Sequence, residues 1–186
     1  MGESSLKNVD NKTLFGEVLR RYKCFKRPFG STIFLGMPGT GKTTHSQEIS
    51  DLNCWCYINP LDLIHTEPIT PEKSDEIIVK SVVDRIKQPI CSHGAVFDNF
   101  PQNMKQSIIF DKELQKFGIK IDRVVELKNS AESFLQRVHK QDEKNDVLEY
   151  YKMQGRVISL DSSKDKDYVS SQLRSIFSKG VYNKTQ

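Results

Sequence analysis

The sequence predicts a single α/β core in which a five-stranded parallel sheet lies between two layers of helices. Apolar and β-branched runs alternate with helical patterns along most of the chain, as in folds built from strand–helix–strand units. The 186 residues suffice for one full hydrophobic core. The five expected strands lie at residues 31–35, 54–58, 94–98, 122–127 and 156–160.

Three helices are expected in the first half of the chain. Leu14, Val18 and Leu19 recur at helical spacing, so the first helix is expected over residues 12–24, ahead of the first strand. The second helix begins at Thr44, directly after the first strand and a glycine-rich turn. The third helix begins at Ser74, and four apolar side chains share its inner face: Val79, Val82, Val83 and Ile86.

The second half of the chain continues the alternation. A helix over residues 102–117 follows the third strand, and Met104, Ile108 and Ile109 are expected to face inward. The remaining expected features are a helix capped by Ser130, a charged stretch at 140–146 that leads to residues 147–151, and a closing helix at 165–178. We divide the chain into an N-terminal extension (1–28), a core (29–179) and a polar tail (180–186).

A phosphate-binding motif follows the first expected strand. The run from Gly36 to Thr43 reads Gly-Met-Pro-Gly-Thr-Gly-Lys-Thr and fits G-x-x-x-x-G-K-[ST] between a strand and a helix. Its glycines let backbone N–H groups turn toward phosphate oxygens, and the helix N-terminus adds partial positive charge. Lys42 would reach the β- and γ-phosphates, and the Thr43 hydroxyl would hold Mg²⁺. The motif therefore predicts a P-loop NTPase fold.

Composition argues against several other functions. The 28 basic and 24 acidic residues leave a mild net charge of +4, and no Lys/Arg-rich block marks a nucleic-acid-binding arm. No apolar run approaches the roughly 18 residues of a membrane span, and the polar N-terminus lacks a signal-peptide pattern. We therefore expect a cytoplasmic protein without a membrane or nucleic-acid partner.

The four cysteines are few and scattered: Cys24, Cys54, Cys56 and Cys91. In a cytosolic protein, residues of this kind are expected to be buried, reduced thiols. A metal site is the alternative interpretation, although the chain lacks paired C-x-x-C motifs.

Further motifs follow the phosphate loop in a fixed order. Asn59-Pro-Leu-Asp62 follows the second strand, Phe97-Asp-Asn-Phe-Pro-Gln102 ends the third, and Phe134-Leu-Gln-Arg137 follows the fourth. Together with the loop, this order and spacing resemble the adenylate kinase family of nucleoside monophosphate kinases, from about residue 31 to the last helix. The resemblance implies an ATP site, a site for a nucleoside monophosphate, and two mobile lids that close over both.

The resemblance also implies roles on the ATP side. Lys42 would bind phosphate, Thr43 and Asp98 would hold Mg²⁺, and Arg137 would stack on the adenine, which makes Lys42, Asp98 and Arg137 the candidate catalytic residues. A strand-end cap is the alternative interpretation of Asp98, and a solvated surface arginine that of Arg137. The candidate ATP-binding residues are Gly36, Pro38, Gly39, Thr40, Gly41, Lys42, Thr43, Thr44 and Arg137.

On the acceptor side, the resemblance implies that Asp62, Gln102 and Gln106 bind the monophosphate, with Gln106 reading its base. An exposed helix glutamine is the alternative interpretation of Gln106. The chain departs from the family here: Gln102 replaces the arginine of F-P-R, and His65 replaces the arginine of G-D-x-x-R. Neither side chain forms the bidentate fork that an arginine offers to a phosphate.

The lid segments are short as well, with eleven residues between Asp62 and Ser74 and a few charged residues after Arg137. Gln141 replaces a further family arginine. The remaining arginines that could substitute are Arg20, Arg21, Arg123, Arg156 and Arg174.

These departures favour an ATP- and Mg²⁺-binding protein whose monophosphate kinase activity is weak or lost. Two alternatives stay open. One is an active minimal kinase, aided by a partner's arginine; the other is a structural module in a larger assembly such as a cilium, a context known for adenylate-kinase-like modules. The helix at 12–24 either docks on the sheet or on a protein partner, and the sequence does not decide between them.

Overall fold

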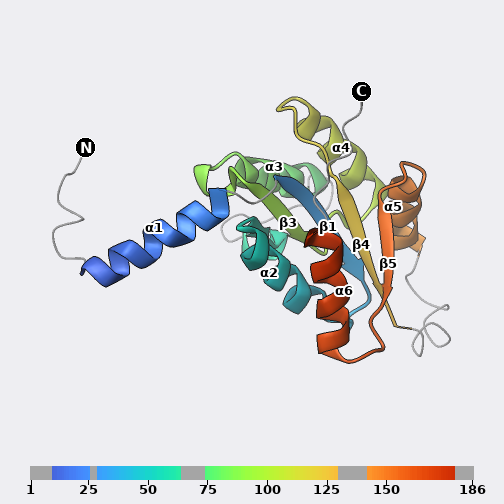
Figure 1. Cartoon of the computed structure of the whole chain (residues 1–186). Coiled ribbons are helices and arrows are strands. Elements are labelled where there is room, and N and C mark those ends of the chain that lie inside the picture. Colours follow the sequence, from blue (N-terminus) through green and yellow to red (C-terminus); the bar gives the residue numbers. More distant parts are fainter. Residues whose placement is uncertain (1–9, 26–28, 64–73, 130–141, 179–186) are drawn as a thin grey trace, which may run out of the picture.

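The computed structural model describes residues 10–25, 29–63, 74–129 and 142–178. Within them, five parallel strands form one sheet in the order β2-β3-β1-β4-β5 (Figure 1). This confirms the predicted class, an α/β fold with helices on both faces of a parallel sheet. The strands are β1 Gly30–Gly36, β2 Cys56–Ile58, β3 Gly94–Asp98, β4 Arg123–Lys128 and β5 Val157–Asp161.

Two apolar layers cover the sheet because successive strand side chains point to opposite faces. On one face, Phe34 of β1 packs with helices α2 (Lys42–Asn53) and α6 (Lys166–Ser178). On the other face, Ile33 packs with three helices, α3 (Ser74–Ile86), α4 (Met104–Gln115) and α5 (Asp142–Lys152). Two short 3₁₀ turns, η1 (Pro60–Asp62) and η2 (Pro89–Cys91), complete the described core.

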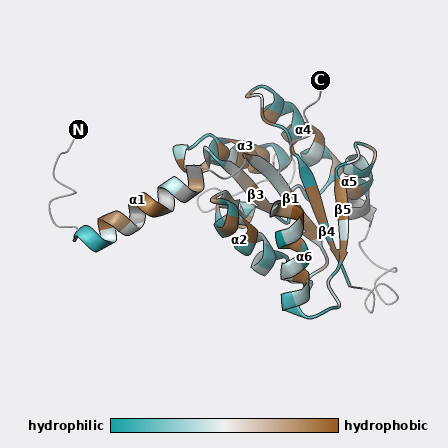
Figure 2. Ribbon diagram, in the orientation of Figure 1, coloured by the Kyte–Doolittle hydropathy of each residue, from teal (hydrophilic) through white to brown (hydrophobic). Residues whose placement is uncertain are grey.

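Helix α1 (Asn11–Phe25) differs from the others because it projects away from the sheet (Figure 1). Its N-terminus is capped by Asp10, whose Oδ1 accepts hydrogen bonds from the backbone N–H groups of Lys12 and Thr13 at 2.9 and 3.0 Å. Its ribbon carries brown, hydrophobic stretches that do not meet the body of the molecule (Figure 2).

Several element boundaries differ from the sequence prediction, most of them by one or two residues, and two of the differences have a clear physical reason. Strand β2 begins at Cys56 and not at residue 54, because Cys54 has a φ of 57° and its N–H closes the last turn of α2. The charged stretch at 140–146 is helical from Asp142 on, since Val147, Leu148 and Tyr151 give α5 a buried face. The predicted helix at Ser130 lies outside the described residues.

The predicted inner face of α4 was wrong in part: Ile109 packs against the core, but Ile108 does not. Ile108 is half exposed, whereas Gln106, Ser107, Phe110 and Leu114 are buried. The spacing of apolar residues did not predict this face, because two of its four buried residues are polar and both have hydrogen-bonding partners. Gln106 bonds to Asp75, and the Ser107 hydroxyl donates to the Asn103 carbonyl oxygen.

The expectation of reduced thiols was also wrong: the four cysteines form two disulfides, Cys24–Cys54 and Cys56–Cys91. Their Cα atoms are 5.4 and 4.8 Å apart, within the range that a disulfide spans. The pairing depends on tertiary neighbours. Strands β2 and β3 lie side by side, which brings Cys56 beside the turn that holds Cys91, and the end of α1 meets the end of α2.

Candidate functional site

The candidate site lies at the carboxyl edge of the sheet. The phosphate loop follows β1, the central strand, and leads into α2. Strand β3 beside it ends at Asp98, and β2 leads into η1. The chain leaves β1 toward β2 on one side and reaches β4 on the other, so the loop lies at the switch point where open α/β sheets bind ligands.

The loop depends on glycine at specific positions. Gly36, Gly39 and Gly41 have φ values of 152°, 84° and 81°, which side chains rarely allow. A Cβ at Gly36 would also lie 2.5 Å from the Leu127 carbonyl oxygen, so β4 would have to move. Gly41 is the N-cap of α2, and the helix begins directly at Lys42.

The described loop is held closed by its own polar groups. The Lys42 Nζ donates to the Met37 carbonyl oxygen at 2.7 Å, and the Thr40 hydroxyl donates to the same oxygen at 2.8 Å. Lys42 therefore arches over the loop, in the position where a phosphate group would offer it a stronger acceptor. Pro38, Gly39 and Thr44 are exposed, so the outer surface of the loop is open to solvent.

A buried carboxylate faces the start of α2. Asp98 is 1% exposed, and its Oδ2 accepts hydrogen bonds from the Thr43 hydroxyl at 2.7 Å and from the Tyr57 hydroxyl at 2.8 Å. Its Oδ1 has no hydrogen-bond partner among the described residues. A buried carboxylate oxygen without a donor is destabilising unless something else satisfies it, and a cation or its bound water would do so.

Sequence reasoning missed Tyr57. In the sheet, Tyr57 of β2 pairs with Val96 of β3, which lies two residues before Asp98. The hydroxyl of Tyr57 therefore reaches the Asp98 carboxylate at the carboxyl edge of the sheet. Burial, and then the hydrogen bond to Asp98, raises the pKa of Tyr57 to about 12, which keeps the hydroxyl protonated as a donor at neutral pH. A polar side chain in the apolar run Trp55–Ile58 was the available signal.

A polar cluster supports the loop from behind. His45 is buried, its backbone N–H donates to the Gly41 carbonyl oxygen at 3.0 Å, and its ring Nδ1 lies 3.6 Å from Glu48 Oε2. The Ser170 hydroxyl of α6 donates to Glu48 Oε2 at 2.6 Å. Burial lowers the pKa of His45, against a smaller opposing effect of Glu48. The ring is therefore neutral near pH 7 and anchors α2 to α6.

The candidate acceptor-binding residues do not converge on one point as the residues around Asp98 do. Asp62 is exposed at the end of η1, and Gln102 is exposed after β3. Gln106 is 3% exposed: its Oε1 accepts from the Gln102 N–H at 2.8 Å, and its Nε2 donates to Asp75 Oδ1 at 2.7 Å. Gln106 thus joins α3 to α4, and its amide would have to release these partners to meet a base. His65, Arg137 and Gln141 lie outside the described residues.

The described arginines named as possible substitutes are engaged elsewhere. Arg123 donates to the Ile176 carbonyl oxygen and lies over the Phe177 ring. Arg156 lies 3.8 Å from Asp111, and Arg174 lies 2.6 Å from Glu48. None of these contacts involves the phosphate loop or the residues that follow β3. The side chains of Arg20 and Arg21 are not described.

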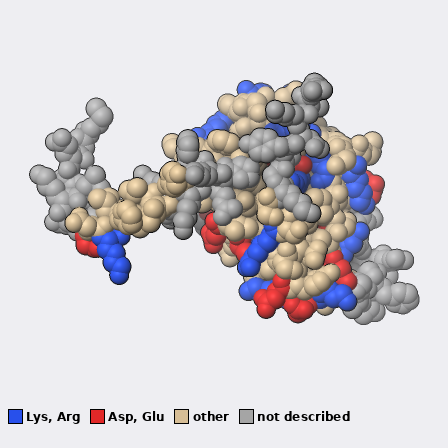
Figure 3. Space-filling view, viewed as in Figure 1, with Lys and Arg blue, Asp and Glu red and all other residues tan. Residues whose placement is uncertain are grey.

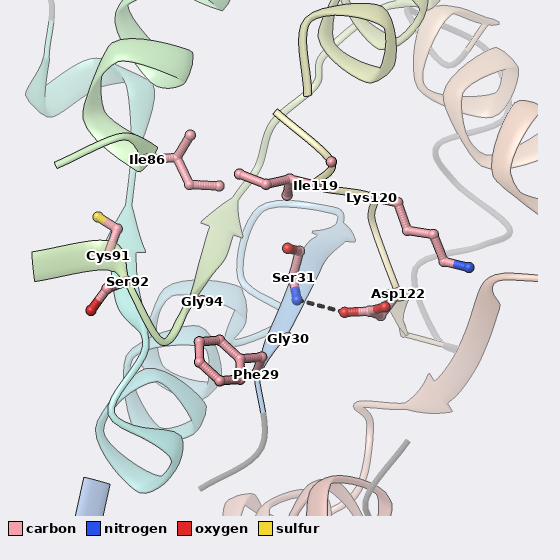
Figure 4. Close-up of a pocket in the computed structure, with 11 residues that line it drawn as sticks. Phe29, Gly30, Ser31, Ile86, Cys91, Ser92, Gly94, Ile119, Lys120 and Asp122 are labelled. Carbon is pink, nitrogen blue, oxygen red and sulfur yellow. Dashed lines mark hydrogen bonds between the residues drawn. The ribbon is translucent and has the colours of Figure 1, made fainter. Parts of the chain in front are cut away.

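A cavity of about 430 Å³ lies at the opposite, amino-terminal edge of the sheet (Figure 4). Gly30 and Gly94, the first residues of β1 and β3, form part of its wall, and the Asp122 carboxylate accepts from the Ser31 N–H at 2.8 Å. The cavity and the phosphate loop therefore lie at opposite ends of the strands.

Within the described residues, no helix has the length and apolar character that crossing a membrane requires.

Comparison with known proteins gave a consistent set of relatives. The chain is 31% identical over 137 residues to adenylate kinase 4 of Oryza sativa subsp. japonica and to adenylate kinase 4 of Arabidopsis thaliana. Each of these alignments covers 66% of this chain and 56% of the plant enzyme, so the chain spans little more than half of those relatives. No protein-family model matches.

A bacterial relative aligns almost end to end. The adenylate kinase of Rhizobium meliloti (strain 1021) is 25% identical over 187 aligned positions, which take in 97% of that enzyme and 77% of this chain. The relatives therefore agree on the family, while the identity in each alignment remains modest.

Proposed function

Because the chain belongs to the adenylate kinase family, we propose that it binds ATP with Mg²⁺ at its phosphate loop and transfers the γ-phosphoryl group slowly or not at all. The binding half of this proposal is supported most by Asp98. A carboxylate that is 1% exposed, 2.7 Å from the Thr43 hydroxyl and with one oxygen lacking a donor among the described residues, suits a hydrated cation.

In the bound state, Lys42 would exchange the Met37 carbonyl oxygen for phosphate oxygens. The loop N–H groups and the N-terminus of α2 would complete the phosphate site, and Thr43 with Asp98 would hold Mg²⁺ directly or through its water. Tyr57 would keep the Asp98 carboxylate oriented by donating to its Oδ2. Magnesium supplies neutralisation of the phosphate charge when it is bound. The adenine would lie against Arg137.

The slow-transfer half of the proposal follows from the acceptor side. Phosphoryl transfer depends on positioning and charge neutralisation, and one arginine at the transferring group changes the rate by roughly 10³–10⁵. Gln102 and His65 stand where the family places two such arginines, and the described arginines of the core are engaged elsewhere. Asp62, Gln102 and Gln106 remain as candidate contacts for a monophosphate.

The binding test is thermal unfolding with ATP, with and without Mg²⁺. We expect Mg²⁺ to add to the stabilisation by ATP in the wild type. In Asp98→Asn that addition is lost, while the stabilisation by ATP alone remains. The matched control is Asp84→Asn, an exposed carboxylate on α3, which should behave as the wild type. Equal Mg²⁺ dependence in Asp98→Asn and the wild type would contradict the assignment of the metal to Asp98.

Two other functions remain as candidates. An active minimal kinase would require an arginine from a partner molecule, and a coupled assay for ADP formation from ATP and AMP distinguishes it. A module held in a larger assembly is favoured by one observation, the exposed apolar side chains of α1. That function is compatible with nucleotide binding, because α1 is separate from the phosphate loop.

A further inference from the structure

Helix α1 exposes an apolar surface that the core does not cover. Its members are large side chains that are each 41% exposed or more, and Phe15 reaches 64%. Figure 3 shows the described part of the helix as an arm that extends from the body. We define this surface, the α1 face, as Leu14, Phe15, Val18, Leu19 and Tyr22.

The spacing of the α1 face fits insertion into a groove. Phe15, Val18, Leu19 and Tyr22 occupy positions i, i+3, i+4 and i+7 of one helix, the pattern with which amphipathic helices dock into apolar grooves. At 100° per residue, the five members of the α1 face fall within one arc of the helix. A helix that packed on its own core would bury such an arc, and α1 does not.

We propose that α1 is a docking helix that inserts the α1 face into an apolar groove bordered by carboxylates on a partner protein. The net positive charge of α1 indicates that the side chains around the partner's groove are acidic. Its sequence contains four basic residues, Lys12, Arg20, Arg21 and Lys23, against the single acid Glu17. An acidic rim would attract this helix and orient it, whereas a basic rim would repel it.

Both ends of α1 are also fixed by contacts that do not depend on a partner. Asp10 caps its first turn, with hydrogen bonds to the N–H groups of Lys12 and Thr13. At the other end, the disulfide between Cys24 and Cys54 holds α1 to the last turn of α2. A helix that is capped and attached before binding loses less conformational entropy when it docks.

Two other occupants are less compatible with α1. A helix of 15 residues is only about 22 Å long. A pair of such helices would bury less than the roughly 800 Å² per partner of a stable dimer, and two basic helices repel each other. A lipid surface would also attract basic residues, but its affinity grows with buried apolar area, and five side chains offer little.

The test uses a defined acidic probe, Ca²⁺-loaded calmodulin, whose apolar groove accepts basic amphipathic helices. We expect the full chain to bind it in a titration, and chelation of Ca²⁺ to abolish binding because it closes the groove. The double variant Phe15→Ser/Leu19→Ser should bind at least about tenfold more weakly. Met153→Ser, which removes a side chain that is 87% exposed on the core, is the matched control and should bind like the wild type.

Three outcomes would overturn the proposal. The first is no Ca²⁺-dependent binding by the wild type, or binding that Phe15→Ser/Leu19→Ser leaves unchanged. The second is a dimer in analytical ultracentrifugation that the double variant dissociates, which would assign the α1 face to a second copy. The third is sedimentation with phosphatidylserine vesicles that the double variant loses. Thermal stabilisation by ATP, measured on the same variant, should be unchanged, so a failure here is distinct from a failure of the nucleotide site.

Discussion

The two halves of the site differ in how their polar groups are arranged. On the proposed triphosphate half, Thr43 and Tyr57 both donate to Asp98, and Lys42 donates to the Met37 carbonyl oxygen of the loop. On the acceptor half, Asp62 and Gln102 are exposed. The side-chain amide of Gln106 is hydrogen-bonded to the Gln102 N–H and to Asp75, and it joins α3 to α4. The polar groups of the first half bond to one another and to the loop, whereas those of the second half join α3 to α4.

Under the proposed function, a family site would be reduced in one half only. The phosphate loop needs glycines, a helix N-terminus and two side chains, all within one short stretch of chain. The acceptor site needs arginines from separate segments, and each can change without disturbing the sheet. The proposed function therefore treats nucleotide binding and phosphoryl transfer as separable properties of this chain.

Removing the loop lysine should have a large effect. ATP at about 100 times its dissociation constant stabilises a protein by about 2.7 kcal/mol, and Lys42→Ala should remove this stabilisation. Its own unfolding free energy should stay near that of the wild type, because Lys42 donates to a carbonyl oxygen of the loop and its side chain is not part of the buried core. Lys120→Ala, exposed at the opposite edge, is the control. Unchanged ATP stabilisation in Lys42→Ala would place the nucleotide elsewhere.

Introducing arginines on the acceptor side should narrow the difference between the affinities of the two halves for their nucleotides. Gln102→Arg together with His65→Arg would offer two forks to the phosphate of AMP. We expect AMP affinity to rise by about tenfold or more, equivalent to roughly 1.4 kcal/mol, while ATP affinity stays constant. Calorimetric titration of both nucleotides measures this. A double variant that binds AMP no better than the wild type would mean that the floor of the acceptor cleft is also lost.

Tyr57→Phe tests the support behind Asp98. The variant removes one hydrogen bond to a carboxylate and keeps the partly buried ring. A bond of this kind contributes about 1.5–3 kcal/mol at most, and Thr43 still orients Asp98, so we expect a several-fold loss in Mg·ATP affinity. Affinity for ATP without Mg²⁺ should not change. Tyr168→Phe, on the half-exposed surface of α6, serves as the reference. Equal losses with and without Mg²⁺ would assign Tyr57 a general structural role.

The smallest effect concerns pH. Because the pKa of His45 is lowered in the folded state from its ordinary value of 6.5, the unfolded chain binds a proton that the folded chain does not when the pH falls below about 6.5. The free energy of unfolding should therefore fall as the pH drops through that window. In His45→Gln this fall should be weaker, as measured by urea unfolding at pH 7 and pH 5. An identical slope in both proteins would show that His45 does not carry the effect.

Much of the fold could be predicted from local patterns. The strand–loop–helix order at residues 31–49 and the alternation after it predicted the parallel sheet, because each signal is contiguous in the sequence. The inner face of α4 could not be predicted, since Gln106 and Ser107 are buried with hydrogen-bonding partners from other elements or turns. The disulfides were missed for the same reason, because Cys56 and Cys91 meet only when β2 lies beside β3.

Sequence reasoning named the candidate residues that lie in contiguous motifs, and it missed one that joins them only in the folded chain. Lys42 and Thr43 belong to a contiguous motif, and Asp98 ends a recognisable strand. Tyr57 joins them through a cross-strand register, and a single sequence does not contain that register. The roles of the candidate residues on both sides of the site remain predictions, those of Lys42, Thr43 and Asp98 included.

The most direct test of the difference between the halves is a pair of calorimetric titrations on the wild-type chain, one with Mg·ATP and one with AMP. The retained loop predicts specific binding of Mg·ATP, and the missing arginines predict that AMP binds at least about a hundredfold more weakly, roughly 2.8 kcal/mol. The same sample should form ADP from the two nucleotides far more slowly than the 1–100 per second of typical kinases, which is an order-of-magnitude range. Comparable affinities for ATP and AMP, with turnover inside that range, would contradict the account.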